Sequence, residues 1–254
     1  MKKKIKSIIK KILHPVAIRV GFMDDDELHE LKSSKDYLLK TFYKVVKTAN
    51  FNPKHIVDVG ANHGSWTREA LNHFPNAQYS MLEPQGWLKS SSQDLLDKND
   101  KIRFYELGAG SSTSTLPFTI SSRDDSSTFN CSQEKAAEFG FEQIQVPVVT
   151  LNEFISKEKL PAPDIIKIDA EGFDLEVLKG ASDFYGVTEV FLVEASINCK
   201  AYHNSLSIIV SAMDGYGYKL FDITDLNRPF ESGLLWLVEL AFVKKEGLLD
   251  THFS

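Results

Sequence analysis

The stretch His55–Gly64, HIVDVGANHG, is the part of the sequence that decides the fold. Its first five residues predict a short buried strand, and the glycines at 60 and 64 then bound a tight turn. From Trp66 onward apolar residues recur at helical spacing, which predicts a helix starting near Ser65. Strand, glycine turn and helix form the first half of a nucleotide-type βα unit. Such a turn is open to a ligand, because glycine has no Cβ and the following helix leaves free N–H groups there.

The residues around this turn indicate which ligand it could hold. The spacing Gly-x-x-x-Gly differs from the G-x-G-x-x-G motif that seats a dinucleotide, and Asp58 would repel a pyrophosphate. A carboxylate there suits a cationic group, such as the amino group of S-adenosylmethionine, bound directly or through water. Glu83 follows the next strand, where an acid commonly binds two ribose hydroxyls. Alternatively, Asp58 caps the helix and Glu83 is a solvated strand end, but two acids beside one glycine turn favour an adenosyl ligand.

Composition favours one large α/β domain. The chain has 254 residues and is 43% apolar, enough for a full core. Its net charge of −6 argues against nucleic-acid binding by the protein as a whole. The two cysteines show no metal spacing and fit reduced, buried thiols, so we expect a cytoplasmic protein. No apolar run is long enough to span a bilayer.

The amino-terminal segment differs from the rest of the chain. Seven cations and no acid lie between residues 2 and 19, with isoleucines at helical spacing, so residues 1–22 are predicted to form a basic amphipathic helix. Two interpretations stay open: the helix lies on an anionic membrane surface, at the inner membrane face, or it packs its isoleucines on the main domain. Residues 23–52 are a helical lead-in, and residues 53–247 form the main domain.

Strands and helices alternate through the main domain, which predicts a mostly parallel sheet with helices on both faces. Residues 111–142 are rich in Ser and Thr and are expected to be largely loop, either a solvated linker or a substrate lid. The expected strands lie at 55–59, 79–82, 102–107, 146–149, 165–168, 187–193, 218–223 and 237–243, with a short extra strand at 116–120.

A second informative stretch, DIIKIDAEGFDLEVLKGA, covers Asp164–Ala181. It predicts a strand that ends at Asp169, a turn through Glu171, and a helix. Two carboxylates then lie at the carboxyl end of a central strand, beside the crevice where doubly wound sheets bind ligands. Lys167 lies within that strand and should pair with an acid if it is buried. Glu194 is expected at the same edge, after the next strand.

Five segments together resemble the FkbM family of S-adenosylmethionine-dependent methyltransferases: VDVGANHG, Glu83-Pro84, LGAG from Leu107, VVTLNEF from Val148, and IKIDAEGFDLEVLKGA. The resemblance covers about residues 53–243. It implies a Rossmann-like seven-stranded sheet with one late antiparallel strand, and methyl transfer, usually to a hydroxyl oxygen, on substrates as different as macrolides and surface sugars. It also implies that Glu83 meets the ribose, that Asp169–Gly172 border the reacting centre, and that the cofactor is lined by Asp58, Gly60, Asn62 and Gly64. We add Ala61, Pro84, Gly108 and Ala109 to the cofactor side.

Methyl transfer to a hydroxyl needs an aligned acceptor and gains from a positioned base. We place Asp169 first, because a carboxylate at a strand end is rigidly held, although it could equally cap the following helix. The other candidates are Glu171, Glu194, His63 and His203. The three carboxylates could also hold Mg²⁺, although nothing in the sequence requires a metal.

The sequence therefore predicts an S-adenosylmethionine-dependent O-methyltransferase acting on a sugar or glycan hydroxyl. Two alternatives remain. One is a non-catalytic, membrane-associated module that binds an adenosyl ligand. The other is an NAD-type oxidoreductase, against which the missing G-x-G-x-x-G motif argues.

Overall fold

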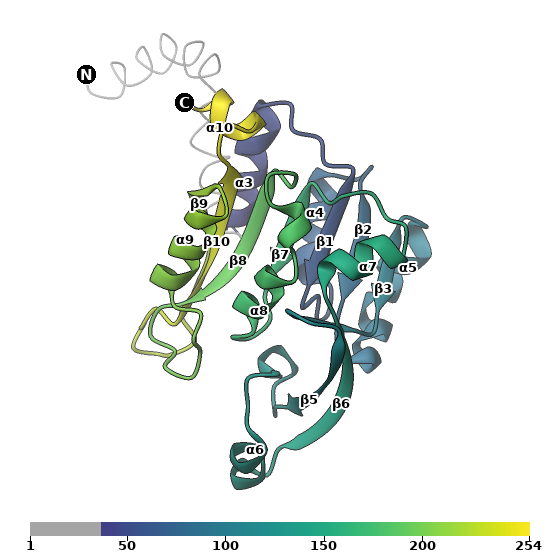
Figure 1. Ribbon diagram of the computed structural model, residues 1–254, viewed down its shortest axis with the longest axis vertical. Helices are drawn as coiled ribbons and strands as arrows, with labels where there is room; N and C mark the ends of the chain where they lie inside the picture. The colour runs from purple at the N-terminus through teal and green to yellow at the C-terminus, as the bar shows by residue number, and fades with distance from the viewer. Residues whose placement is uncertain (1–36) are drawn as a thin grey trace, which may run out of the picture.

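The computed structural model describes residues 37–254 (Figure 1). Its main sheet has seven strands in the order β3-β2-β1-β7-β8-β10-β9. Strand β10 pairs antiparallel with β8 and β9, and the other pairings in this sheet are parallel, which confirms the expected single late antiparallel strand. In sheet order the strands are β3 (Ile102–Tyr105), β2 (Gln78–Leu82), β1 (His55–Val59), β7 (Ile165–Ile168), β8 (Val190–Ser196), β10 (Leu237–Lys244) and β9 (Tyr218–Asn227).

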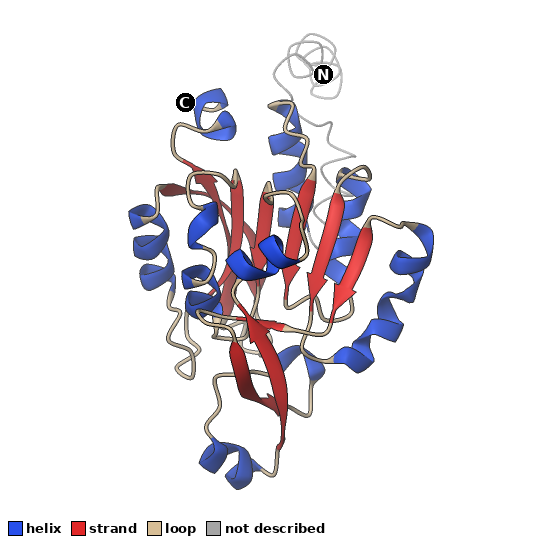
Figure 2. Ribbon diagram, turned by 45° about the vertical axis from the view of Figure 1, so that its right-hand side comes forward, coloured by secondary structure: helices blue, strands red, loops and turns tan. Residues whose placement is uncertain are grey.

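Helices cover both faces of this sheet (Figure 2). One face packs against α7 (Leu151–Lys157), α8 (Asp174–Lys179) and α9 (Leu206–Gly215). The other packs against α3 (Tyr37–Thr48), α4 (Ser65–His73), α5 (Gln93–Lys98) and α10 (Leu248–His252). Successive side chains of a strand point to opposite faces, so Ile56 belongs to the second core cluster and Val57 to the first. All residues of β1 and β7 are buried, as expected for central parallel strands.

A second, smaller sheet projects beyond the main one (Figure 1). It contains β4 (Gly108–Ala109), β6 (Glu142–Val149) and β5 (Ser114–Ile120), in that order. A short helix, α6 (Gln133–Phe139), lies between β5 and β6 in the chain; Ser132 caps its start and Gly140, at φ 68°, ends it. The short strand expected at 116–120 is β5, and the polar segment that follows it contains only a 3₁₀ turn, Asp124–Ser126, before α6. Neither α6 nor the start of β6 at Glu142 was predicted from the sequence, because the β5–β6 pairing is a contact between separate segments.

Other boundaries differ from the sequence prediction in ways that matter for the site. The strand expected over 102–107 ends at Tyr105, and the chain then enters the second sheet. Strand β8 continues to Ser196, so Glu194 lies inside the strand and not after its end. Between β2 and β3 the chain forms a 3₁₀ helix, Gly86–Ser92, followed directly by α5. Cys199 is buried, whereas Cys131 is partly exposed, and neither forms a disulfide.

The predicted amphipathic helix at 1–22 lies outside the described residues. Within residues 37–254, no helix is both long and apolar enough to cross a membrane. The described part of the helical region expected at 23–52 belongs to the core, because α3 buries four of its side chains against the sheet: Leu39, Phe42, Tyr43 and Val46.

Candidate active site

The glycine turn after β1 is held by left-handed backbone conformations at Gly60 (φ 72°), Asn62 (φ 47°) and Gly64 (φ 75°). A Cβ on Gly60 would lie 1.8 Å from the carbonyl oxygen of Asp169. Glycine is thus required there by the approach of β7 to the turn, in addition to its backbone conformation. Gly64 begins α4, and a Cβ on it would meet the side chain of Ser92. Both glycines therefore secure packing around the turn.

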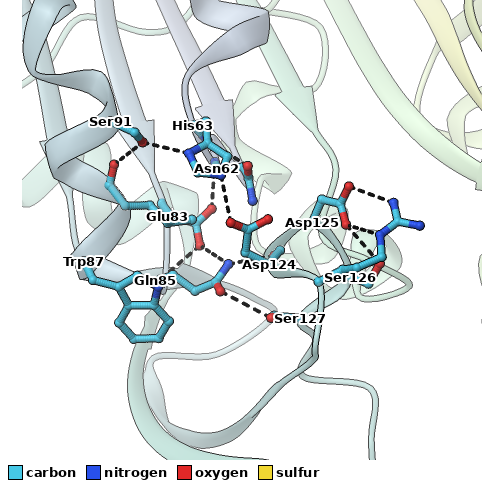
Figure 3. A network of polar contacts seen from close by, with 12 residues as sticks. Asn62, His63, Glu83, Gln85, Trp87, Ser91, Asp124, Asp125, Ser126 and Ser127 are labelled. Atoms are coloured by element: carbon cyan, nitrogen blue, oxygen red, sulfur yellow. Dashed lines mark hydrogen bonds and ion pairs between the residues drawn. The ribbon is translucent and has the colours of Figure 1, made fainter.

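Glu83, at the end of β2, is the centre of a hydrogen-bond network beside this turn (Figure 3). One carboxylate oxygen accepts from the Asn62 backbone N–H at 2.8 Å. The other accepts from the backbone N–H of Gln85 at 2.9 Å and from its side-chain amide at 3.2 Å. Burial raises the pKa of Glu83, and these hydrogen bonds act in the opposite direction. Oε1 therefore has both lone pairs in use, whereas Oε2 can accept one further hydrogen bond, from a ligand hydroxyl.

Glu83 lines a cavity of about 560 Å³ at the carboxyl ends of β1, β2 and β7. Of the residues predicted from the sequence, the cavity brings together Gly60, Asn62, Glu83, Pro84, Gly108, Ala109, Asp169 and Glu171. The segment between β5 and α6 closes one side with residues that the sequence analysis missed, namely Asp124, Asp125, Ser127 and Phe129.

Three predicted cofactor residues do not line this cavity: Asp58, Ala61 and Gly64. Asp58 is fully buried, and its carboxylate accepts a hydrogen bond from Thr67 at 2.6 Å and pairs with Lys167 at 3.2 Å. The carboxylate expected to face a cationic ligand is therefore turned toward the protein interior. The register explains this orientation, because Asp58 and Lys167 are opposite each other on β1 and β7.

The two histidine candidates differ in position. His63 contacts Ser91 through Nδ1 at 2.9 Å and Asp124 through Nε2 at 2.8 Å (Figure 3). It therefore joins the glycine turn to the segment between β5 and α6. His203 is exposed and lines neither cavity described here. No motif in the sequence linked Asp124 to His63, because 61 residues separate them.

Lys167 is buried at the junction of β1 and β7. Its Nζ lies 3.2 Å from Asp58 Oδ1, 3.3 Å from Asp169 Oδ2 and 3.0 Å from the carbonyl oxygen of Gly60. Burial lowers the pKa of this lysine, but the charges of Asp169 and Asp58 outweigh burial and the net pKa is raised. Lys167 is therefore a cation that already has two carboxylate partners, as the sequence analysis expected of a buried lysine.

Asp169, Glu171 and Glu194 come together at the edge of the sheet, each with one oxygen within 4.8 Å of the others. Burial, followed by the charge of Asp169, raises the pKa of Glu171 to about 8. The same two causes raise the pKa of Glu194 well above its usual value. Tyr202, from the segment after β8, donates a hydrogen bond to Glu171 and was not identified from the sequence.

Asp169 does not cap α8, because no side chain accepts a hydrogen bond at the start of this helix. Asp174 is fully buried and accepts hydrogen bonds from the backbone N–H groups of Ala170 at 3.0 Å and Gly172 at 3.2 Å. Asp169 instead pairs with Lys167, and 38% of its side chain is exposed. Its carboxylate is thus accessible at the cavity wall.

A second cavity, of about 1,070 Å³, adjoins the first and shares Asp125 and Asp169 with it. It is bounded by α3 and α4 on one side and by β8, β9 and β10 on the other. Lys167 is its one lysine or arginine among the described residues, whereas six carboxylates line it: Glu69, Asp125, Asp169, Glu194, Asp225 and Glu239. The two cavities meet at Asp169.

A doubly wound sheet with a cavity at the carboxyl ends of its strands is the architecture in which Rossmann-like folds bind ligands. A family model described as "Methyltransferase FkbM domain" matches residues 58–220. The chain belongs to the FkbM methyltransferase family, which confirms the resemblance seen in the sequence and makes it a member of an S-adenosylmethionine-dependent class.

The chain is also similar to solved structures. One is the methyltransferase FkbM of Methylobacillus flagellatus KT, which is 19% identical at a TM-score of 0.53 and aligns over 75% of this chain and 43% of that one. This chain thus spans less than half the length of that relative. A precorrin-6y C5,15-methyltransferase of Geobacter metallireducens GS-15 is 15% identical at a TM-score of 0.45, over 79% of this chain and 85% of the other. No curated protein matches the chain.

Proposed function

We propose that this protein transfers the methyl group of S-adenosylmethionine to a hydroxyl oxygen of a sugar or glycan. The observation that carries the proposal is the meeting of two cavities at Asp169. One cavity suits an adenosyl ligand and the other an acceptor rich in hydroxyl groups. Transfer between two substrates requires such a shared boundary, because the acceptor oxygen must lie in line with the methyl group.

The first cavity has the chemistry that S-adenosylmethionine needs. Glu83 offers a buried carboxylate whose Oε2 can accept one further hydrogen bond, which suits a ribose hydroxyl. The apolar residues Leu82, Phe118 and Phe129 provide surface for an adenine ring. When bound, the sulfonium supplies an activated methyl group, so the protein does not need to generate a strong electrophile.

The protein's own task is to position and activate the acceptor. Asp169 is held by Lys167 and opens toward both cavities. In the proposed reaction it orients the acceptor hydroxyl and takes up its proton as the oxygen is methylated. The segment between β5 and α6, which includes Asp125, helps to exclude water from the junction.

The second cavity supports a polyhydroxylated acceptor. Its carboxylates are hydrogen-bond acceptors, and sugar hydroxyls are donors that match them. The single lysine in the lining is already paired with Asp58 and Asp169, so it offers little to an anionic acceptor. A neutral sugar fits this lining better than a phosphorylated or acidic one.

The proposal is tested in two stages with the full chain. Calorimetry with S-adenosylhomocysteine and with NAD establishes the cofactor; we expect the first to bind and the second not to bind. Transfer from isotopically labelled S-adenosylmethionine is then measured on free sugars, glycans and lipid-linked sugars. A product that keeps its label in mild base is a methyl ether, whereas a methyl ester loses it. Binding without transfer to any acceptor would favour a non-catalytic binding module.

A further inference from the structure

The junction between the two cavities gathers more carboxyl groups than the nearby cation can balance when they are ionised. Three carboxylates converge there: Asp169 after β7, Glu171 in the following turn, and Glu194 within β8. Lys167 pairs with Asp169 and also with Asp58, so its charge is shared by two acids. Neither Glu171 nor Glu194 forms an ion pair with a lysine, arginine or histidine of residues 37–254.

Glu194 gives a second, independent indication of a missing partner. Its Oε2 atom is covered completely by the protein and accepts no hydrogen bond. A buried carboxylate oxygen without a partner is costly, because it has lost water without gaining a donor. The neighbouring strand adds to the imbalance, since Glu239 lies directly opposite Glu194 in the register of β8 and β10.

We propose that Asp169, Glu171 and Glu194 bind one divalent cation of the Mg²⁺ or Mn²⁺ type. The donor set is made of carboxylate oxygens, without histidine or cysteine, and oxygen ligands suit these hard ions. Their mutual spacing, within 4.8 Å, is compatible with ligands of one ion. The ion supplies the charge that Lys167 cannot, and it gives Glu194 Oε2 a partner.

The position suggests what the ion does. It lies where the cavity with Glu83 meets the acidic cavity, because Asp169 lines both and Glu194 lines the second. Mg²⁺ keeps several waters when it is bound by a few carboxylates, and a hydroxyl of the acceptor can replace one of them. The ion then orients that hydroxyl and makes it more acidic. This role rests on the proposed function, whereas metal binding by the three carboxylates does not.

Metal binding is tested directly on the full chain. After treatment with a chelator and dialysis, the protein is titrated with Mn²⁺, and the free ion is followed by electron paramagnetic resonance. We expect one Mn²⁺ per chain, displaced by excess Mg²⁺. Glu194→Gln and Glu171→Gln should each weaken binding by roughly 10–100-fold or more, since even loss of a group that supports a ligand has an effect of this size. Glu69→Gln is the matched control, because it removes a carboxylate from the wall of the acidic cavity and lies outside the cluster.

Two results overturn the inference: no Mn²⁺ bound at millimolar concentration, or unchanged binding in both cluster variants. Circular dichroism and S-adenosylhomocysteine affinity, measured in parallel, show that each variant is folded. These readouts also separate the two proposals. Metal binding without S-adenosylhomocysteine binding defeats the proposed function alone, whereas the reverse defeats only the metal site.

Discussion

Lys167 and Asp58 lie opposite each other on neighbouring central strands, with Nζ 3.2 Å from Oδ1, and both side chains are buried. The pair fixes the ends of β1 and β7, from which the glycine turn and Asp169 both emerge. Lys167 also lines the acidic cavity, so this structural ion pair lies at the wall of that cavity.

Removing one member of this pair should be costly. Lys167→Met leaves Asp58 buried without a counter-charge, and we expect a loss of about 3–5 kcal/mol in the free energy of unfolding. Urea denaturation measures this loss. The double variant Asp58→Asn with Lys167→Met should recover much of the stability, because the amide keeps the contact with Thr67 and carries no charge. A loss below about 1 kcal/mol in the single variant would show that the pair is not needed for stability.

Glu83 is expected to carry much of the cofactor affinity. Glu83→Gln keeps the size of the side chain but removes its charge, and it replaces one acceptor oxygen with a donor. S-adenosylhomocysteine binding should weaken by about 1.5–3 kcal/mol, as for a lost charge-assisted hydrogen bond. Calorimetry gives the value, and Glu138→Gln, on the exposed side of α6, serves as the control. Equal affinity in the two variants would place the ribose elsewhere.

Gly60 and Gly140 allow backbone conformation to be separated from close packing. Both have left-handed backbones, with φ of 72° and 68°. Gly140→Ala meets no atom within 4 Å and should cost only the conformational strain, about 1–2 kcal/mol. Gly60→Ala also forces a Cβ against the carbonyl oxygen of Asp169. We therefore expect the free energy of unfolding to fall by at least about 3 kcal/mol and turnover to be lost. Thermal unfolding of both variants checks this, and similar costs would mean that the turn can move away from β7.

Asp169 is tested by a change that preserves its shape. Asp169→Asn removes the proton acceptor, so turnover should fall by ~10²–10⁴ while S-adenosylhomocysteine affinity is kept. Single-turnover methyl transfer and calorimetry measure the two quantities separately. Turnover at the wild-type level would leave Asp169 with only its pairing to Lys167.

The buried acids should make stability depend on pH. Burial raises the pKa of Glu239 from its usual 4.5 to about 7, so the folded protein retains a proton that the unfolded chain releases. The unfolded state then binds fewer protons between these two values, and stability should fall as the pH rises from about 4.5 through about 7. Glu239→Gln should reduce this fall, measured by urea denaturation in the presence of a chelator. If the unfolding free energy of Glu239→Gln fell with pH as steeply as that of the wild type, other groups would be responsible for the pH dependence.

Short-range patterns in the sequence determined much of this protein. Alternating strand and helix periodicity, the glycines at 60 and 64, and the acids that follow apolar runs were enough to predict the main sheet and to locate Glu83, Asp169 and Glu171 at its carboxyl edge. The segment IKIDAEGFDLEVLKGA further indicated the family. These features are readable because each depends on residues within one strand, turn or helix.

The tertiary structure alone decided which of these residues face one another. Lys167 and Gly60 are 107 residues apart, and their contact depends on β1 and β7 being neighbours in a fixed register. The same register turned Asp58 inward, away from the ligand cavity predicted for it. The pairing of β5 with β6 formed a second sheet, in which β6 begins at Glu142, earlier than the strand expected from the sequence. Such contacts depend on strand order and side-chain direction in three dimensions, and no local pattern in a single sequence encodes them.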